Sequence, residues 1–331
     1  MTSIRFLLLS IFAVAVSLAT PLWDAVDPEQ VLFIASRCME DWSPKAKDPK
    51  KALENWMNWK LQPSDDQATH CYTKCMLEKI GFYDFGEKKF KGVRVVQQWE
   101  TYHQYQSADR EKVLALADEF NLIKLQKSFN CTAVFNAYKD VHAKYLDTIK
   151  AILFGDRSSA EKFYKAKGDT IKQKGQSLFV FCENINYPAG SAKRKQELCK
   201  IRKYELSSGK EFSNHMACIF KGLRYLNKKN ELNAEEIVRD LQLVGKKPNA
   251  MKATLQKCKG NLKETDPGAI AIHYYKCLLD DPKVVDDFKE AFDYREIRSQ
   301  DYMSLLRSSM KPYEKSEVRK MVDKIDDKQC S

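Results

Sequence analysis

The sequence lacks the motifs of the common enzyme classes. Its 331 residues contain no His-Glu-x-x-His metal motif, no Gly-x-Ser-x-Gly nucleophile motif and no phosphate-binding P-loop. No pair of carboxylates is singled out for glycoside chemistry. We therefore expect no catalytic site, no metal and no cofactor, and we predict that the protein is not an enzyme. The histidines also form no cluster in the sequence; they are His70, His103, His142, His215 and His273.

Long apolar runs are absent beyond the N-terminus. The chain begins MTSIRFLLLSIFAVAVSLATPLW, in which Arg5 precedes an apolar run that ends near Ala15, and the small residues Ser17 and Ala19 precede Thr20. This pattern is typical of a secretory signal peptide that is cleaved near Ala19. No later segment has the roughly 20 apolar residues that a membrane span needs. We expect a secreted, soluble protein whose mature chain begins at Thr20.

Low-complexity segments are absent and alternating strand patterns are rare, whereas helix starts are frequent. The best strand candidate, VRVV at Val93, is short and flanked by charge. Asp27–Gln30 forms a capping box with proline at the first helical position. Ser158–Glu161 and Asn233–Glu236 have the same form, and Asp281 with Pro282 predicts a further start. These patterns predict an all-α protein.

The mature length fits about two domains. The segment LFGDRSS, residues 153–159, is the predicted boundary, because Gly155 can end one helix and Ser158 can start the next. We therefore expect a signal peptide at residues 1–19, a first domain at 20–158 and a second at 159–331. There is no strict repeat period, which argues against a solenoid.

Ten cysteines lie in the mature chain, and their even number in a secreted protein predicts disulfides. Cys71 and Cys75 are four residues apart and lie on one face of a helix. A zinc site would need two further soft ligands nearby, and none is present. We expect two disulfides from this helix to two different helices. The sequence by itself leaves many pairings open.

Positive charge exceeds negative charge. The chain has 56 Lys and Arg beside 45 Asp and Glu, and loss of Arg5 lowers the formal charge from +11 to +10. This balance favours anionic partners, or it serves solubility alone. The sequence has no aromatic-basic motif of a nucleic-acid-binding module, so we expect no nucleic-acid partner.

The stretch EAFDYREIRS, residues 290–299, places two acids on an apolar helix face. Phe288, Ala291 and Phe292 form a stripe, and Asp293 and Glu296 continue it. A buried carboxylate is costly unless a cation or strong donor meets it. Either the helix turns to solvent there, or a positive group arrives.

Two other segments contain polar groups beside apolar ones. His215 lies on the apolar stripe of KEFSNHMACIF, where a histidine is more often a core residue than a ligand. Arg202 and Tyr204 follow Cys199, and a basic residue there is more often on the surface than in a site.

Aromatic residues of the first half allow two interpretations. Trp56 and Trp59 are three apart in ENWMNW, and Tyr72 lies between the paired cysteines. They form either a core tryptophan pair or an aromatic wall for a lipid cavity. Nearby, Asn130 fits the glycan acceptor pattern, but its occupancy depends on whether Cys131 is bridged first.

Several long segments together resemble one known family. They are DPEQVLF and RCMED near the start, CYTKC, FCENINYPAGSAKRKQELCKIRKY, KGLRYLNKKNELNAEE and HYYKCLLDDPKVVDDFKEAFDYREIRSQ. Nearly the whole mature chain resembles the long-form D-seven salivary proteins of blood-feeding mosquitoes. These are two-domain relatives of insect odorant-binding proteins, so the resemblance implies two disulfide-stapled helical domains of that type.

The resemblance implies a non-catalytic, monomeric scavenger in saliva that opposes vasoconstriction, platelet activation and inflammation. Members of the family capture biogenic amines such as serotonin, histamine and catecholamines in the C-terminal domain. They capture eicosanoids in the N-terminal domain, mainly cysteinyl leukotrienes and in some members thromboxane analogues. Two alternatives remain: an interaction protein that blocks a coagulation or receptor surface, and an odorant or pheromone carrier.

The family's site residues carry over to this chain. The implied lipid-binding residues are Trp56, Trp59, Tyr72 and Lys174, with Lys174 on a helix from Ser159 to Cys182 that the two domains share. The implied amine-binding residues are Arg202, His215, Tyr275, Asp293 and Glu296, and the ligand's ammonium is then the positive group that meets the two acids. The implied disulfides are Cys38–Cys75, Cys71–Cys131, Cys182–Cys218, Cys199–Cys330 and Cys258–Cys277.

Overall fold

The computed structural model describes residues 23–125, 129–190, 193–302 and 313–330. The predicted signal peptide at residues 1–19 lies outside these ranges. None of the helices in the described ranges has the length and apolar character that crossing a membrane requires.

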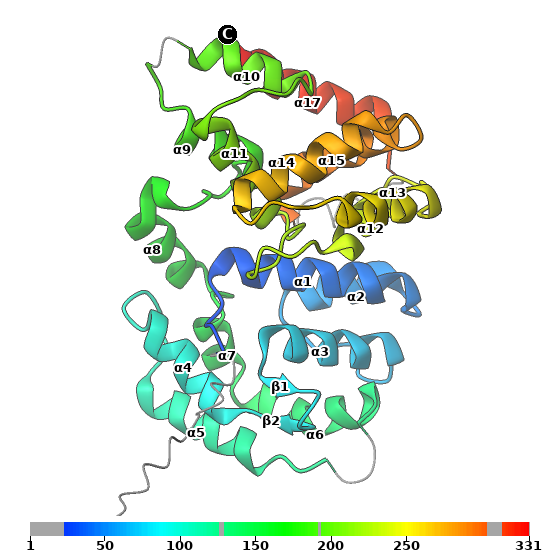
Figure 1. Cartoon of the computed structure of the whole chain (residues 1–331). Coiled ribbons are helices and arrows are strands. Elements are labelled where there is room, and N and C mark those ends of the chain that lie inside the picture. The colour runs from blue at the N-terminus through cyan, green and yellow to red at the C-terminus, as the bar shows by residue number, and fades with distance from the viewer. Residues whose placement is uncertain (1–22, 126–128, 191–192, 303–312, 331) are drawn as a thin grey trace, which may run out of the picture.

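The described chain is mainly helical and has almost no strand, which confirms the predicted all-α class (Figure 1). The helices of its first half are α1 (Pro28–Trp42), η1 (Ser43–Lys45), α2 (Pro49–Met57), α3 (Gln67–Ile80), α4 (Gly92–Tyr102), α5 (Arg110–Leu122), α6 (Cys131–Lys144) and α7 (Leu146–Ile152). Those that follow are α8 (Arg157–Lys167), η2 (Gly168–Thr170), α9 (Leu178–Asn186), α10 (Arg194–Arg202), α11 (Lys210–Gly222), α12 (Ala234–Leu243), α13 (Asn249–Gly260), α14 (Pro267–Asp280), α15 (Val285–Gln300) and α17 (Lys315–Cys330).

The structure contains one short β-hairpin that the sequence patterns did not predict. Strands β1 (Tyr83–Asp84) and β2 (Lys89–Phe90) pair antiparallel, with Tyr83 opposite Phe90. Two residues per strand are too few for a visible alternation. The segment at Val93 belongs to α4 instead, in which Val95 is fully buried.

The predicted helix starts differ in their accuracy. The capping box of α1 is confirmed, because the Asp27 side chain accepts from the Gln30 N–H at 2.8 Å and the Gln30 side chain accepts from the Asp27 N–H at 3.1 Å. The prediction of a capping box at Ser158–Glu161 is wrong. Asp156 caps α8 by accepting from the Ser159 N–H at 2.8 Å, so Ser158 lies inside the helix. Helix α12 begins just after Asn233, but the Asn233 side chain makes no capping bond.

Two further boundaries need correction. Helix α15 begins at Val285 rather than at Asp281, and residues 282–284 form a turn. The Asp281 side chain accepts from the Lys283 N–H of this turn at 2.9 Å and from Thr254 at 2.7 Å. Residues 159–182 do not form one helix. The chain turns at Gly168, where φ is +50°, and then runs through a loop to α9. Lys174 therefore lies on a loop.

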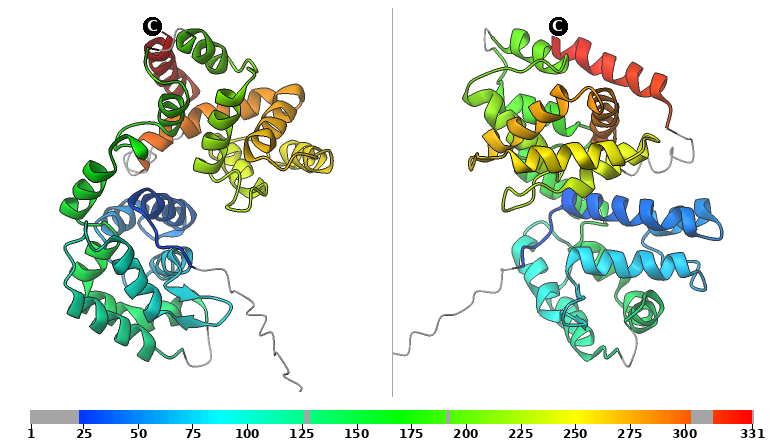
Figure 2. Two further views of the ribbon diagram at one scale, coloured as in Figure 1. Left: turned by 60° about the vertical axis from the view of Figure 1, so that its left-hand side comes forward. Right: turned by 45° about the vertical axis from the view of Figure 1, so that its right-hand side comes forward.

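The described residues form two large hydrophobic cores and one small cluster, in which Ile297 of α15 packs with Val318 and Val322 of α17. The first draws on α1 to α7 and runs in sequence from Val26 to Leu153, and the second draws on α9 to α15 and runs from Leu178 to Phe292. In Figure 1 the first group of helices lies below the second, with α8 along one side (Figure 1). The turned views in Figure 2 keep the same separation. The division at residues 158 and 159 stays a prediction.

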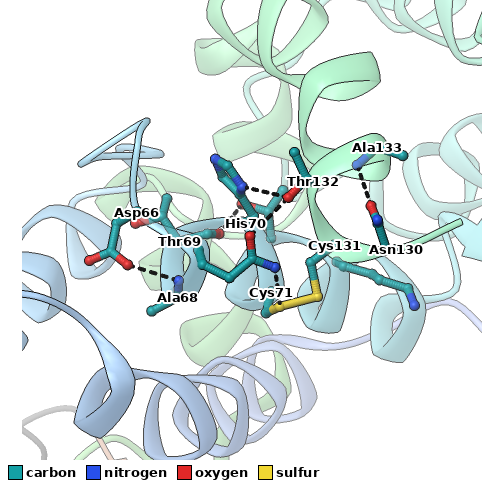
Figure 3. The surroundings of a disulfide bond; sticks show 12 residues. Asp66, Ala68, Thr69, His70, Cys71, Asn130, Cys131, Thr132 and Ala133 are labelled. Carbon is teal, nitrogen blue, oxygen red and sulfur yellow. Dashed lines mark hydrogen bonds between the residues drawn. A yellow bond between two sulfur atoms is a disulfide. The ribbon is translucent and has the colours of Figure 1, made fainter. Parts of the chain in front are cut away.

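The described residues form five disulfides, each between two helices, and their pairs are those that the resemblance implies. Cys71–Cys131 joins α3 to α6, beside His70 and Thr132 (Figure 3). Cys38 in α1 meets Cys75 in α3, so α3 is linked to two different helices, as predicted. The other three pairs are Cys182–Cys218, Cys199–Cys330 and Cys258–Cys277.

The glycan acceptor pattern lies at the start of α6. The Asn130 side chain caps this helix by accepting from the Ala133 N–H at 2.9 Å, and the neighbouring Cys131 is bridged (Figure 3). Glycan occupancy at Asn130 stays open.

Candidate ligand-binding sites

A cavity of about 450 Å³ lies between the first core and helix α8. All four predicted lipid-binding residues line it, although they come from three separate stretches of the chain. Trp56 and Trp59 come from α2 and the turn after it, Tyr72 from α3, and Lys174 from the loop before α9. We call this space the first cavity.

The aromatic wall of the first cavity is rigidly packed. The rings of Trp56 and Tyr72 stack with centroids 4.3 Å apart and an interplanar angle of 2°. Both side chains are buried, and burial raises the pKa of Tyr72. Gly155 accommodates the Trp59 indole, because a methyl group on Gly155 would lie 2.5 Å from that ring. The tryptophans are therefore both core residues and cavity lining.

The charged rim of the first cavity is mostly neutralised. Lys172 pairs with Glu29 at 2.9 Å. Arg157 pairs with Glu161 at 2.6 Å. Lys174 is exposed, and within the described ranges no carboxylate lies within ion-pair distance of its ammonium group. Its charge is thus available to an anionic group at the rim.

A smaller space of about 40 Å³ extends the first cavity into the core. It shares Trp59, Tyr72 and Leu153 with the larger space and is lined further by Tyr138 and His142. Burial lowers the pKa of His142 to about 4, so this imidazole is neutral at physiological pH. The deep end is apolar and uncharged, as the end of a lipid tail requires.

A second, much smaller cavity of about 30 Å³ lies in the second core. The structure brings all five predicted amine-binding residues together around it. Arg202 comes from α10, His215 from α11, Tyr275 from α14, and Asp293 and Glu296 from α15. We call this space the second cavity.

Arg202 is the positive group that meets Glu296. Its Nη1 lies 2.9 and 2.8 Å from the two carboxylate oxygens, and Ser177 donates to Glu296 at 2.9 Å. The same guanidinium reaches Glu183 at 2.6 Å and Asp326 at 3.2 Å. The expectation that Arg202 is a surface residue is therefore wrong, because three carboxylates draw its side chain inward. Burial raises the pKa of Glu296 to about 7, although Arg202 opposes this shift.

Asp293 has different partners from those of Glu296. The Tyr204 hydroxyl donates to Asp293 Oδ1, and Arg319 from α17 reaches Oδ2 at 3.3 Å. Burial raises the pKa of Asp293, and the bond from Tyr204 opposes this. Tyr204 thus also lines the second cavity rather than pointing to solvent. The two acids share one cavity lining but not one partner.

His215 and Tyr275 supply the less polar part of the second cavity. Both are buried, and Tyr275 packs against Phe292 with ring centroids 5.9 Å apart. Burial lowers the pKa of His215 to about 3, so the imidazole is neutral. Neither ring nitrogen makes a well-formed hydrogen bond to the described residues. His215 is a core residue, as its position on the stripe predicts, and it also lines the cavity.

Negative charge exceeds positive charge around the second cavity. Its lining contains four carboxylic acids and one cation, Arg202. Burial also raises the pKa of Asp326, to about 6. Sequence reasoning missed Glu183 and Asp326. Glu183 follows the bridged Cys182, but Asp326 lies among many charges of α17 and gave no pattern that could have distinguished it. A lining with surplus acid can accept a cation.

Metal binding has no support in the part of the chain that the structure describes. Within it, no three or more His, Cys, Asp or Glu side chains converge as metal ligands would.

Comparison with protein families places most of the chain in one of them. The PBP/GOBP family model matches residues 23–143 and 168–281. The chain is 64% identical to long form salivary protein D7L1 of Aedes albopictus over 326 residues, which cover 98% of each chain. It is 62% identical to long form salivary protein D7L2 of Aedes aegypti over 328 residues, or 99% of this chain and 98% of the relative.

Solved structures with the same fold contain small ligands. The AeD7–leukotriene E4 complex is 40% identical, with a TM-score of 0.77 over 85% of this chain and 92% of that chain. The AnSt-D7L1–U46619 complex is 32% identical, with a TM-score of 0.79 over 92% and 97%. Culex quinquefasciatus D7 long form 1 in complex with ADP is 30% identical, with a TM-score of 0.83 over 94% and 100%.

Proposed function

Since the chain belongs to the PBP/GOBP family and, within it, to the long-form D7 salivary proteins, we propose that it is a secreted scavenger of small host mediators. It holds eicosanoids in the first cavity and biogenic amines in the second. The observation that carries the proposal is the convergence of Trp56, Trp59, Tyr72 and Lys174 on one cavity of about 450 Å³.

The first cavity matches an amphipathic lipid acid. Small-molecule sites have volumes of about 300 to 1,000 Å³ and are lined mainly by apolar and aromatic groups. The space of about 450 Å³, with its aromatic wall and uncharged deep end, fits a long unsaturated tail. The ammonium of Lys174 at the rim fits a carboxylate. Complexes of two relatives with leukotriene E4 and U46619 support this assignment.

The second cavity matches an amine by charge rather than by volume. A space of about 30 Å³ holds about one water molecule, so an amine must displace side chains or shift α17. The ligand's ammonium supplies a further cation to a lining with four acids and Arg202, in which Arg319 also reaches Asp293 at 3.3 Å. Tyr275 and Phe292 provide ring contacts for an indole or catechol. The neutral His215 imidazole can exchange a hydrogen bond with the ring hydroxyl.

Calorimetric titration tests the proposal for both cavities. We expect one site for leukotriene E4 and one for serotonin. Serotonin should bind with the same affinity whether or not the protein is saturated with leukotriene, because the cavities share no lining residue. Competition between the two ligands would contradict the two-site assignment, and the absence of binding by either would contradict that half of it.

The two alternative functions make different predictions. An odorant carrier needs one apolar cavity and a neutral ligand, which the acidic lining of the second cavity does not favour. A blocker of a coagulation or receptor surface would bind its protein target with both cavities occupied. Titration of a clotting factor into the ligand-saturated protein separates that function from mediator capture.

A further inference from the structure

An open groove of about 1030 Å³ runs between α9, α10, α17 and the loop before α9. Helices α10 and α17 lie side by side at the end of the molecule that is remote from α5 (Figure 1). Five cations line the groove, and we call it the cationic groove: Lys174, Arg194, Lys195, Lys324 and Lys328.

The lining of the cationic groove contains no carboxylate. The whole chain has 56 Lys and Arg beside 45 Asp and Glu, so this lining departs strongly from the average. Helix α17 accounts for the separation. Met321, Lys324, Ile325 and Lys328 lie on the groove face at helical spacing. The acids of the same helix face elsewhere, where Asp326 meets Arg202.

The uncharged lining of the groove is rich in hydrogen-bonding groups. Gln176, Asn184, Gln300 and Gln329 contribute amides, and Ser177 contributes a hydroxyl. Two of these amides also position a cation, because Arg194 Nη2 donates to Asn184 at 2.8 Å and to Gln329 at 3.3 Å. The lining contains no aromatic ring on which a nucleotide base could stack.

We propose that the cationic groove binds a linear sulfated polysaccharide. Cations that are spread over three segments suit a linear ligand whose negative charges repeat along its length. They suit a small anion with its charges at one point less well. Amides and a hydroxyl between the cations suit the hydroxyl groups of sugar rings. A groove of about 1030 Å³ that is open to solvent admits a strand whose ends extend beyond it. Such a ligand would hold the protein in the extracellular matrix beside its small mediators.

The cationic groove and the first cavity can be altered independently by substitution. Lys174 and Gln300 line both spaces, whereas Lys195 and Lys324 line only the groove. Both of these lysines are exposed, and no ion pair of the described chain involves either one. Replacing them should therefore leave the fold and the first cavity unchanged.

The test compares binding of a size-defined heparin oligosaccharide to the full chain and to two double variants. Lys195→Gln with Lys324→Gln removes two groove cations. The matched control, Lys139→Gln with Lys252→Gln, removes two exposed lysines from α6 and α13 and lowers the net charge equally. At physiological salt we expect the groove variant to lose at least about tenfold in affinity and to show a shallower salt dependence. The control should change little, and both variants should bind leukotriene E4 as the wild type does.

Three results would overturn the inference. Equal loss in both variants would mean that general charge, and not the groove, attracts the polysaccharide. Equal binding of an unsulfated oligosaccharide of the same length would mean that sulfate is not recognised. Tighter binding of ATP or inorganic polyphosphate, with the same sensitivity to the groove variant, would mean that the groove takes phosphate anions instead.

Discussion

At the scale of single residues, the carboxyl groups of Asp293 and Glu296 lie one turn apart but depend on different neighbours. Arg202 and Ser177 hold Glu296, whereas Tyr204 and Arg319 hold Asp293. Each acid is stabilised without a ligand, and yet acids outnumber cations in the lining. The lining is therefore stable when empty and still favours an added cation.

Neutral isosteres of these acids test the amine site. Glu296→Gln and Asp293→Asn keep the shape and remove the charge. We expect each to lower serotonin affinity by about 1.5–3 kcal/mol, or roughly ten- to a hundredfold, because a charge-assisted hydrogen bond in a water-poor cavity is lost. The free energy of unfolding should hold or rise, because surplus negative charge is removed. Serotonin affinity that is unaltered in both variants would remove α15 from the site.

The pH dependence of amine binding follows from the same groups. Glu296, with a pKa raised to about 7, faces Arg202, Glu183 and Asp326 from other helices. Protonation removes the charge that attracts the ammonium, so serotonin affinity should fall roughly tenfold or more from about pH 8 to about pH 5.5. His215 stays neutral throughout, because its pKa is about 3.

The same titration affects stability in a defined direction. The folded chain holds the Glu296 proton more tightly than the unfolded chain, since burial raises this pKa from 4.5 to about 7. The contribution of this group to the free energy of unfolding should therefore fall as pH rises through that window. Glu296→Gln should remove the part of both profiles near pH 7 and leave the part near pH 6, where Asp326 titrates. A pH dependence of serotonin binding near pH 7 that persists in this variant would assign it to another group.

Lys174 is the corresponding residue for the lipid site. Lys174→Ala should weaken leukotriene E4 binding by roughly tenfold and leave serotonin binding intact, because a lipid carboxylate at the rim loses its cation. The matched control is Lys162→Ala on α8, an exposed lysine that does not line the first cavity. If both ligands lose affinity equally, the loop before α9 is structural and the two-cavity assignment is wrong.

At the scale of elements, capping chemistry could be predicted only where it is local. The box at Asp27 forms because its two partners are three residues apart in one helix. At α8 two candidate caps compete, and Asp156 prevails over Ser158. The β1–β2 hairpin and the loop of Lys174 depend on contacts with distant segments, which a window of local sequence does not contain.

The candidate sites show the same limit. The resemblance supplied nine lining residues, and all nine line the two cavities. The position of Arg202 among three acids could not be derived from its own segment, because Glu183, Glu296 and Asp326 come from three other helices. Only the assembled fold shows which of the many charges on α17 face inward.

The disulfide between α10 and α17 is the element-scale feature with the largest expected effect. Cys199 and Cys330 are 131 residues apart, and a loop of this length corresponds to a stabilisation of about 5 kcal/mol in the chain-entropy model. Cys199→Ser with Cys330→Ser should lower the midpoint of thermal unfolding and weaken serotonin binding, because Arg202 and Asp326 lie on the two helices. Leukotriene E4 binding should persist. An unchanged thermal midpoint, in this variant or after full reduction, would contradict the expectation.

At the scale of the whole molecule, the two cores meet through a buried network of charges. Arg37 of α1 reaches Glu236 and Asp240 of α12 at 2.6 and 2.8 Å. Arg298 of α15 meets Glu40 of α1. Arg37, Asp240 and Arg298 are buried, so the junction of the two halves contains a polar, specific network beside its apolar contacts. A polar junction of this kind fixes one mutual orientation, because charges must meet their partners.

Asp240 is the centre of this network, and its replacement gives the sharpest test of the junction. Its carboxylate accepts from Arg37 at 2.8 Å and from the Tyr225 hydroxyl at 2.9 Å, and Arg295 lies 3.4 Å away. Asp240→Asn would leave buried arginines without their shared anion, so we expect a loss of about 3–5 kcal/mol in the free energy of unfolding. Denaturant titration measures this change.

The control for Asp240→Asn is Asp41→Asn, at the rim of the same junction. Asp41 pairs with Arg239 at 2.9 Å but is 39% exposed, so its loss should cost no more than about 1 kcal/mol. Calorimetry should also show the two cores unfolding in separate transitions in Asp240→Asn, because the network links α1 to α12 and α15. A single transition at the wild-type midpoint would mean that the network is neutral in stability. The orientation of the two halves would then depend on α8 and the apolar contacts around Phe33 and Tyr302.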